Sequence, residues 1–162
     1  MPIKNNVTRL LDSRRIEYET VEYDADEFHA ATEVAALIGV PADHVYKTIV
    51  VRRESVAGAI GRSPLLVMVP GDREIDLKQL AAALGEKKLR VATHDEAESL
   101  TGLQVGGISA LALLNKPFEV CLDRSALELS HLYVSAGQRG LNVKIGVQDL
   151  IRLTKAKTVN AV

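Results

Sequence analysis

The stretch that decides the fold is Val45-Tyr46-Lys47-Thr48-Ile49-Val50-Val51, an apolar segment with one lysine near its start. Its β-branched residues predict a strand that is covered on both faces. We place this strand at the centre of a sheet, together with the apolar strand over residues 65–69 that follows it. Because an ammonium group loses hydration in such surroundings, we expect Lys47 to face an anion or a carbonyl group in a small-molecule cleft.

Size and composition predict one compact domain over residues 1–162. The chain has 162 residues, of which 47% are apolar, and it contains no linker-like run of charges or of proline, glycine and serine. Its apolar stretches are too short to cross a bilayer and its first residues do not resemble a secretory signal, so we expect a cytoplasmic protein without membrane contact. The lone cysteine, Cys121, lies in an apolar segment that predicts a packing role for its thiol.

The charge is nearly balanced but unevenly distributed. A formal net charge of -1 argues against broad, non-specific binding of nucleic acid, including DNA. Residues 17–33 hold seven acidic residues and no lysine or arginine, whereas residues 138–162 hold five basic residues and one acidic residue. Two interpretations stay open: this asymmetry orients a polyanion toward the C-terminal half, or it is a solvated charged face.

Periodicity and capping residues predict the other elements. Helices are expected from Ile3 to Arg14, from the N-cap Thr32 to Ile38, from the N-cap Asp76 to Leu84, from the N-cap Thr93 to about Gly102, and from Val147 to Thr154. Further strands are expected over residues 16–23, 118–122, 132–135 and 141–145, and a polar connection around Gly58 and Gly61. The sequence therefore predicts an α/β (α+β) domain with a mixed, largely antiparallel sheet or barrel flanked by helices.

Familiar catalytic motifs are absent. Gly107-Ile108-Ser109-Ala110-Leu111 begins like a nucleophile elbow but lacks its final glycine. The four histidines are dispersed and the cysteine is single, so no metal site is expected. The chain has no phosphate-binding loop and no dinucleotide fingerprint, and therefore no cofactor is predicted.

A few polar groups remain as candidates for acyl chemistry. They are the Lys47 amine, the backbone amides of Gly106-Gly107, and the hydroxyls of Thr48, Ser109 and Ser135. Amides and an ammonium group can stabilise the charge that an ester oxygen gains when water attacks the carbonyl carbon. Each feature also has an alternative interpretation without a ligand. Lys47 would then be a strand-edge lysine that reaches solvent, and Gly106-Gly107 would be a tight turn.

Four blocks in fixed order carry a family resemblance. They cover residues 45–51, 67–72 (Val-Met-Val-Pro-Gly-Asp), 101–109 (Thr-Gly-Leu-Gln-Val-Gly-Gly-Ile-Ser) and 134–140 (Val-Ser-Ala-Gly-Gln-Arg-Gly). Together they resemble the YbaK and prolyl-tRNA-synthetase-associated editing domains over nearly the whole chain. The resemblance implies a free-standing hydrolase that cleaves the ester of a mischarged aminoacyl-tRNA. It also implies the tRNA acceptor end as partner, and a synthetase as a further one.

The resemblance also implies roles for individual residues. It assigns catalysis to Lys47 and Gly107. It assigns substrate binding to Tyr23, Phe28, His29, Thr48, Gly106, Ile108, Ser109, Ser135, Gly137, Arg139 and Asn142.

Two positions depart from the family pattern. Ala110 stands where the family loop has proline, which removes one restraint on φ, and Asn142 stands where many members carry an acid. The expected substrate carries a small amino acid, for example cysteine or alanine on tRNA-Pro, because errors between small side chains call for a second, hydrolytic selection. The alternative is a non-catalytic module of the same fold that binds a tRNA end or a synthetase.

Overall fold

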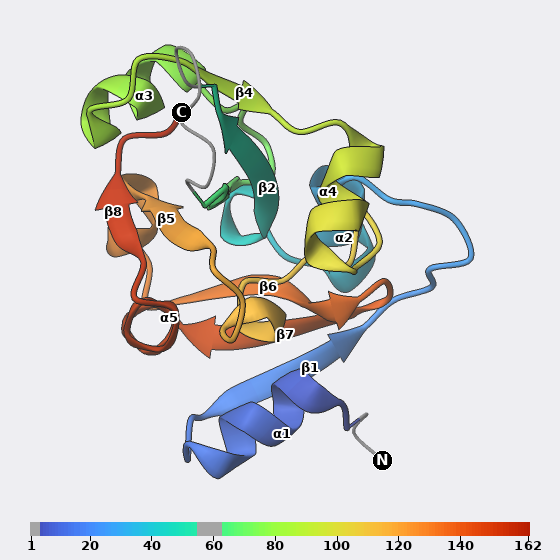
Figure 1. Ribbon diagram of the computed structural model, residues 1–162. Helices are drawn as coiled ribbons and strands as arrows, with labels where there is room; N and C mark the ends of the chain where they lie inside the picture. The colour runs from blue at the N-terminus through green and yellow to red at the C-terminus, as the bar shows by residue number, and fades with distance from the viewer. Residues whose placement is uncertain (1–3, 55–62) are drawn as a thin grey trace.

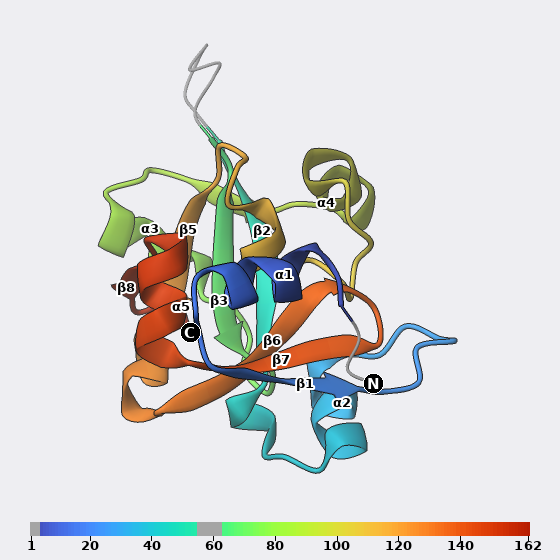
Figure 2. The same cartoon turned by 90° about the horizontal axis from the view of Figure 1, so that it is seen from below.

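Two sheets dominate the computed structural model, which describes residues 4–54 and 63–162 (Figure 1). The smaller sheet is antiparallel and has the order β1-β7-β6, with β1 at Tyr18–Glu22, β7 at Leu141–Gly146 and β6 at His131–Gln138. The larger has the order β4-β2-β3-β5-β8, with the bounds Leu89–Val91, Tyr46–Arg53, Leu65–Pro70, Glu119–Asp123 and Lys157–Val159. Here β2 pairs antiparallel with β3 and β4, whereas β5 is parallel to β3 and β8. The strands of the two sheets cross, and an isolated bridge between Val45 and Tyr133 links them (Figure 2).

Five α-helices of eight residues each accompany the sheets in the described residues: α1 at Asn6–Ser13, α2 at Ala31–Ile38, α3 at Leu77–Leu84, α4 at His94–Thr101 and α5 at Val147–Thr154. Three short 3-10 helices follow the same chain: η1 at Ala42–His44, η2 at Leu111–Leu113 and η3 at Arg124–Glu128. None of the helices in the described residues is long and apolar enough to span a bilayer.

Most elements lie where the sequence predicts them, and the predicted α+β class is confirmed. Thr32 is not the N-cap of α2, because the helix begins two residues earlier: the Glu33 carboxylate accepts a hydrogen bond from the backbone N–H of Ala30 (3.2 Å), which is the N-cap. The strands β4 and β8 were not predicted, since three residues are too few to show a period. The predictions at Ile3 and around Gly58 and Gly61 lie outside the described residues.

The strand β3 forms the centre of the core, because all six of its residues are buried. Leu66 and Met68 face the cluster between the two sheets, whereas Leu65, Val67 and Val69 face a second cluster that includes Leu80 of α3. Burial on both faces is thus confirmed for this strand. In β2, Val50 and Val51 are buried as predicted, but residues 47–49 are only half-buried, since β4 pairs only with residues 51–53.

Cys121 of β5 has the predicted packing role. Its side chain is fully buried in the cluster under α3. Burial raises the pKa of the Cys121 thiol to about 11, which keeps it protonated and unreactive at neutral pH.

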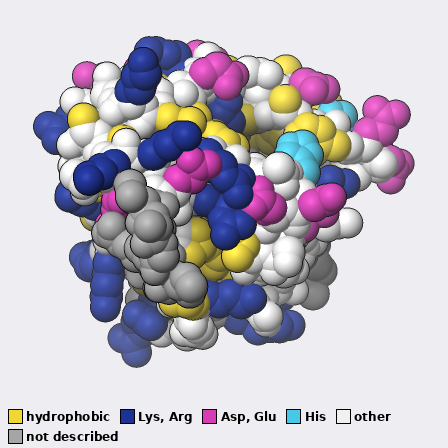
Figure 3. All heavy atoms as spheres, turned by 45° about the horizontal axis from the view of Figure 1, so that its top comes forward, with side chains coloured by type: hydrophobic (Ala, Val, Ile, Leu, Met, Phe, Trp, Pro, Cys, Tyr) yellow, Lys and Arg dark blue, Asp and Glu magenta, His cyan; other side chains and the backbone are white. Residues whose placement is uncertain are grey.

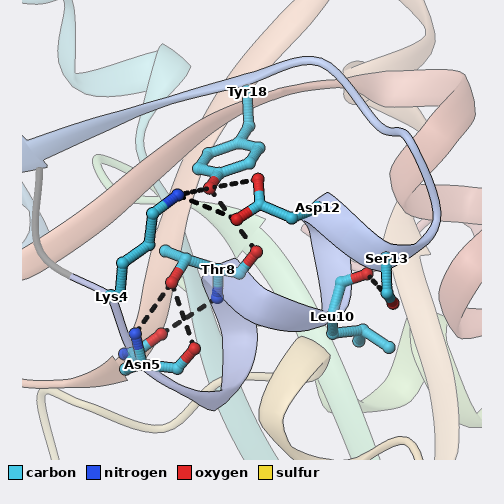
Figure 4. A network of polar contacts seen from close by, with 7 residues as sticks. All are labelled: Lys4, Asn5, Thr8, Leu10, Asp12, Ser13 and Tyr18. Carbon is cyan, nitrogen blue, oxygen red and sulfur yellow. Dashed lines mark hydrogen bonds and ion pairs between the residues drawn. The ribbon is translucent and has the colours of Figure 1, made fainter.

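The helix α1 is fixed to β1 by a polar network (Figure 4). Lys4 Nζ lies 2.8 Å from Asp12 Oδ2, and the hydroxyl of Tyr18 donates to Asp12 Oδ1 (2.8 Å). Asn5 caps the helix by accepting a hydrogen bond from the backbone N–H of Thr8 (3.0 Å). These contacts hold α1 against the smaller sheet, whose inner face packs on β2 and β3.

Glu96 joins the start of α4 to the larger sheet. Its carboxylate accepts two hydrogen bonds from Arg90 of β4 (2.7 Å each), one from Arg52 of β2 (2.5 Å) and one from the backbone N–H of Thr93 (3.0 Å). The hydrogen bonds from Arg90, Thr93 and Arg52 hold the pKa of Glu96 well below its usual range. This carboxylate therefore positions α4 relative to β2.

The lowered pKa predicts how acid weakens the fold. The unfolded chain takes up a proton at Glu96 near the ordinary glutamate pKa of about 4.3, whereas the folded chain does so only at lower pH. The contribution of Glu96 is therefore present at neutral pH and declines as the pH falls below about 4. At pH 7 the urea midpoint of Glu96→Gln should be lower than that of wild type. Between pH 5 and pH 3 the midpoint of the variant should decrease less than the midpoint of wild type. The exposed control Glu17→Gln should follow wild type, and an unchanged acid profile in Glu96→Gln would contradict this role.

Candidate functional site

A cleft of about 470 Å³ lies beside β2 and is bounded by α2, α4 and the smaller sheet. This volume is in the range of small-molecule sites. Figure 3 shows hydrophobic and histidine side chains side by side around a hollow on this face of the molecule. The lining includes nine of the predicted site residues: Tyr23, Phe28, His29, Lys47, Thr48, Gly106, Ile108, Ser135 and Asn142.

The cleft borders an open edge of β2. Alternate residues of a strand turn their backbone groups to the same side. The carbonyl of Val50 points away from β3 and accepts a hydrogen bond from the N–H of Ala92 (2.9 Å). Thr48, two residues earlier, turns its N–H and C=O the same way, but β4 pairs only with residues 51–53. The backbone of Thr48 therefore offers a donor and an acceptor to a ligand in the cleft.

Lys47 lies at the start of this open edge. Its side chain is 27% exposed, and its Nζ is 3.9 Å from Oε1 of Glu74, a carboxylate that is itself 95% exposed. An ion pair of this length with a fully solvated partner contributes little to stability. The ammonium group is thus placed at the cleft without being committed to a partner in the fold.

The turn at Gly106-Gly107 presents one amide and not two. Gly106 has φ of +95°, which favours glycine, and its N–H donates no hydrogen bond to any described residue. The N–H of Gly107 donates to the carbonyl of Gln104 (2.8 Å), and Gly107 is not part of the cleft lining. A Cβ atom at Gly107 would lie 2.9 Å from the backbone N of Arg139 and 2.9 Å from the carbonyl carbon of Gln138. Gly107 therefore allows the turn to pack on the β6–β7 hairpin.

The side of the cleft formed by the smaller sheet carries an amide and a hydroxyl. Asn142 of β7 is paired in register with Ser135 of β6. The residue is only 4% exposed, and its side chain makes no hydrogen bond with any described residue. Its amide atoms still reach the open space of the cleft, because no side-chain nitrogen or oxygen of the described residues is both fully buried and without a partner. Asn142 thus presents to the cleft an amide that water or a ligand can satisfy.

The loop between β1 and α2 brings two rings to the cleft. Tyr23 and His29 meet edge to face, with 6.3 Å between the ring centroids. Nδ1 of His29 lies 3.3 Å from Oε2 of Glu33, and this contact, together with the N–H of Ala30, lowers the pKa of Glu33. Glu33 thereby fixes the orientation of the His29 ring at the start of α2.

Three other predicted site residues lie outside the cleft lining, and contacts within the fold account for each of them. Ser109 is buried, and its hydroxyl accepts a hydrogen bond from the N–H of Leu111 (3.2 Å) at the start of η2. Gly137 packs against Ala112 and Val7. Arg139 donates from Nε to the carbonyl of Val105 (2.7 Å) and lies behind the glycine turn.

Ala110, which stands where the family loop has proline, has a backbone conformation that a proline could adopt. Ala110 has φ of -61°, close to the value of about -65° that a proline ring imposes. Its side chain is buried and does not line the cleft. The buried Ala110 thus has, without the ring restraint, a φ that a proline at this position would also adopt.

Some lining residues carry no signal in the sequence. His94 and Glu74 line the cleft, although neither belongs to a motif that predicts binding. The capping box at Thr93 places His94 in the first turn of α4, but only the packing of α4 brings it to the cleft. Such residues can be found only from tertiary structure.

The fold and the cleft define an α+β domain with a small-molecule cleft at a strand edge, and comparisons with known proteins give its family. The model of the "Aminoacyl-tRNA editing domain" family matches residues 25–153. The Enterococcus faecalis protein named "Putative Cys-tRNA(Pro)/Cys-tRNA(Cys) deacylase EbsC" is 31% identical over 155 residues, which are 95% of this chain and 90% of that protein. The "Prolyl-tRNA editing protein ProX" of Acetoanaerobium sticklandii is 28% identical over 96% of this chain and 93% of its own length.

A solved structure supports the same fold. The crystal structure of a "putative trans-editing enzyme for prolyl tRNA synthetase" matches with a TM-score of 0.77 and 23% identity, over 99% of this chain and 98% of that one. The chain belongs to the aminoacyl-tRNA editing domain family.

The packing of Gly107 predicts the effect of a side chain there. Gly107→Ala should lower the free energy of unfolding by about 1–3 kcal/mol, because the new methyl group meets backbone atoms that cannot move independently. Urea unfolding measures this loss. If Gly107→Ala had the stability of wild type but no activity, the packing role would be contradicted, and a direct contact of Gly107 with substrate would be indicated.

Proposed function

We propose that this protein hydrolyses, in trans, the ester bond of a mischarged tRNA that carries a small amino acid such as alanine or cysteine on tRNA-Pro. The observation that carries the proposal is the cleft itself. There a lysine, an open strand edge and an amide that has no hydrogen-bond partner in the described residues line one cleft, in a chain of the editing family. The partner is the acceptor end of the aminoacyl-tRNA, with prolyl-tRNA synthetase as the enzyme whose errors are corrected. The cytoplasm, where charged tRNA is used, is the proposed location.

The groups in the cleft suit attack by water without a protein nucleophile. The cleft lining contains no cysteine, and its one serine, Ser135, accepts a hydrogen bond from the N–H of Gly137 (3.2 Å). When water adds to the ester carbon and loses a proton, the carbonyl oxygen becomes an oxyanion. Collapse of this intermediate breaks the bond to the ribose oxygen, which takes up a proton, so that the free amino acid and the tRNA hydroxyl are released. The Lys47 ammonium and the N–H groups of Thr48 and Gly106 can stabilise the oxyanion. The two N–H groups cost little to hold in place, because the fold already fixes the backbone that carries them.

Selection among amino acids is assigned to the side of the cleft opposite β2. Ile108 limits the space there, and the amide of Asn142 offers a carbonyl oxygen to the substrate ammonium group. The neutral amide oxygen can accept a hydrogen bond from the substrate ammonium group without placing a carboxylate at this position. One methylene changes binding by about 1–3 kcal/mol, so small substrates are separated from larger ones mainly by exclusion.

Removal of Lys47 tests the catalytic proposal. Lys47→Ala should reduce kcat/KM for deacylation of Ala-tRNA-Pro by about 100-fold or more, the loss typical of one electrostatic stabiliser. Release of labelled alanine measures the rate. Lys144→Ala is a matched control, because Lys144 also lies on a strand and has a glutamate at 4.0 Å, yet does not line the cleft.

Two results would contradict the proposal. Unchanged turnover in Lys47→Ala, with the fold intact by circular dichroism, would reject the role of Lys47. Binding of charged tRNA by wild type without ester loss across a panel of mischarged tRNAs would favour the non-catalytic module.

Asn142 tests substrate recognition separately from folding. Asn142→Leu should leave the urea midpoint unchanged or raise it, because the amide has no protein partner to lose. The same variant should lower kcat/KM about 10- to 150-fold, the equivalent of a hydrogen bond to a charged group worth ~1.5–3 kcal/mol. A destabilised protein with normal activity would show instead that Asn142 is a structural residue.

A further inference from the structure

Phe28 is exposed at the rim of the cleft. Its side chain is 48% exposed, and it lines the cleft together with His29 and Gly106. Large apolar side chains are normally covered, and an exposed one beside a binding cleft marks a contact surface. Of the other exposed large apolar side chains of the described residues, Val91 also lines the cleft, whereas Leu37 and Leu127 do not.

The ring of Phe28 is held in place from several sides. The guanidinium carbon of Arg139 lies 5.6 Å from the ring centroid, and Nε of Arg139 is fixed by the carbonyl of Val105 (2.7 Å). A Cβ atom at Gly106 would lie 3.2 Å from Cδ2 of Phe28 and 3.3 Å from Nε of Arg139, so the ring and the guanidinium rest on bare backbone. On another side, the ring of His94 lies at a centroid distance of 6.4 Å and a tilt of 54°.

Phe28 thus lies next to two other planar groups, His94 at the rim of the cleft and Arg139 beside it. The three come from distant parts of the chain: the β1–α2 loop, the N-terminus of α4 and the β6–β7 hairpin. Aromatic rings and arginine planes are the groups on which unpaired nucleobases stack. A guanidinium group beside the ring also favours a negatively charged RNA. The planar groups at this rim therefore fit a nucleobase better than an aliphatic side chain.

The substrate chemistry places a base at the same point. The amino acid is esterified to the terminal ribose, so an aminoacyl group inside the cleft holds that ribose at the opening and its base just outside. We propose that Phe28, supported by Arg139 and His94, is a stacking platform for the terminal base of the aminoacylated RNA. This proposal rests on the proposed function and deepens it by naming the part of the RNA that the domain contacts directly.

A fluorescent substrate mimic tests the platform without catalysis. The probe is a trinucleotide of two cytidines and a 3′-terminal 2-aminopurine nucleoside that carries alanine through an amide, so it cannot be hydrolysed. Stacking quenches 2-aminopurine. Wild type and Phe28→Trp should bind and quench the probe, whereas Phe28→Leu should bind roughly 5- to 150-fold more weakly, the equivalent of ~1–3 kcal/mol per stacked base, and lose the quenching. Leu127→Ala, which removes an exposed apolar side chain elsewhere, should match wild type.

A second probe separates the base from the amino acid. It is the same trinucleotide with an abasic terminal sugar, which should bind wild type and Phe28→Leu equally. Equal affinity and quenching of the first probe by wild type and Phe28→Leu would overturn the platform. If Phe28→Leu lost affinity equally for both probes, the platform would also be overturned, and Phe28 would be assigned to contact with the aminoacyl group.

Deacylation of Ala-tRNA-Pro, measured in parallel, distinguishes the two proposals. If wild type hydrolyses the tRNA but Phe28→Leu binds and quenches normally, the platform fails and the proposed function stands. If wild type neither hydrolyses the tRNA nor binds the probe, both fail.

Discussion

The pairing of β2 with β3, and its absence on the other edge of β2, is the constraint on which the site depends. The buried β3 fixes the first residues of β2 from one side, while β4 covers only residues 51–53 on the other. A strand edge is normally a liability because its N–H and C=O groups seek partners. Here the edge is short and enclosed by α2, α4 and the smaller sheet, which makes it accessible to a small ligand but not to another strand.

The remaining features of the cleft follow from that edge. The turn at Gly106, where glycine supplies a positive φ, lines the same cleft, and Gly107 allows this turn to pack on the β6–β7 hairpin. Glu96 holds α4 to β4 and β2, so that the helix closes one side of the cleft. Asn142 faces the edge from the smaller sheet. Binding groups therefore lie on rigid elements, which limits the reorganisation that a reaction requires.

The fold could be predicted from the sequence where periodicity and capping agree. The capping box at Thr93 and the N-cap Asp76 fixed the starts of α4 and α3, and the apolar run over residues 65–69 marked the central strand. The register of the strand pairing could not be predicted, because the parallel pairing of β3 with β5 joins residues that lie more than fifty positions apart. The strands β4 and β8 were missed because three residues give no pattern.

The site could be predicted only in part, for a related reason. Lys47 and Gly106 carried a signal in the sequence, since a lysine in an apolar strand and a glycine pair are both unusual. Arg139 and Gly137 belong to a block that resembles the family. The sequence could not show which side of the hairpin their side chains and backbone face, and both support the fold beside the cleft. His94 had no signal at all, because its place at the rim comes from helix packing.

The most direct test of the central claim is a nitrogen–proton NMR titration with adenosine that carries alanine through a 3′-amide. The account predicts that the largest shifts fall on the backbone amides of Thr48 and Gly106 and on the side-chain amide of Asn142, while the Gly107 amide, bonded to Gln104, moves little. Shifts confined to another face of the molecule, with the Thr48 amide unaffected at saturation, would contradict it.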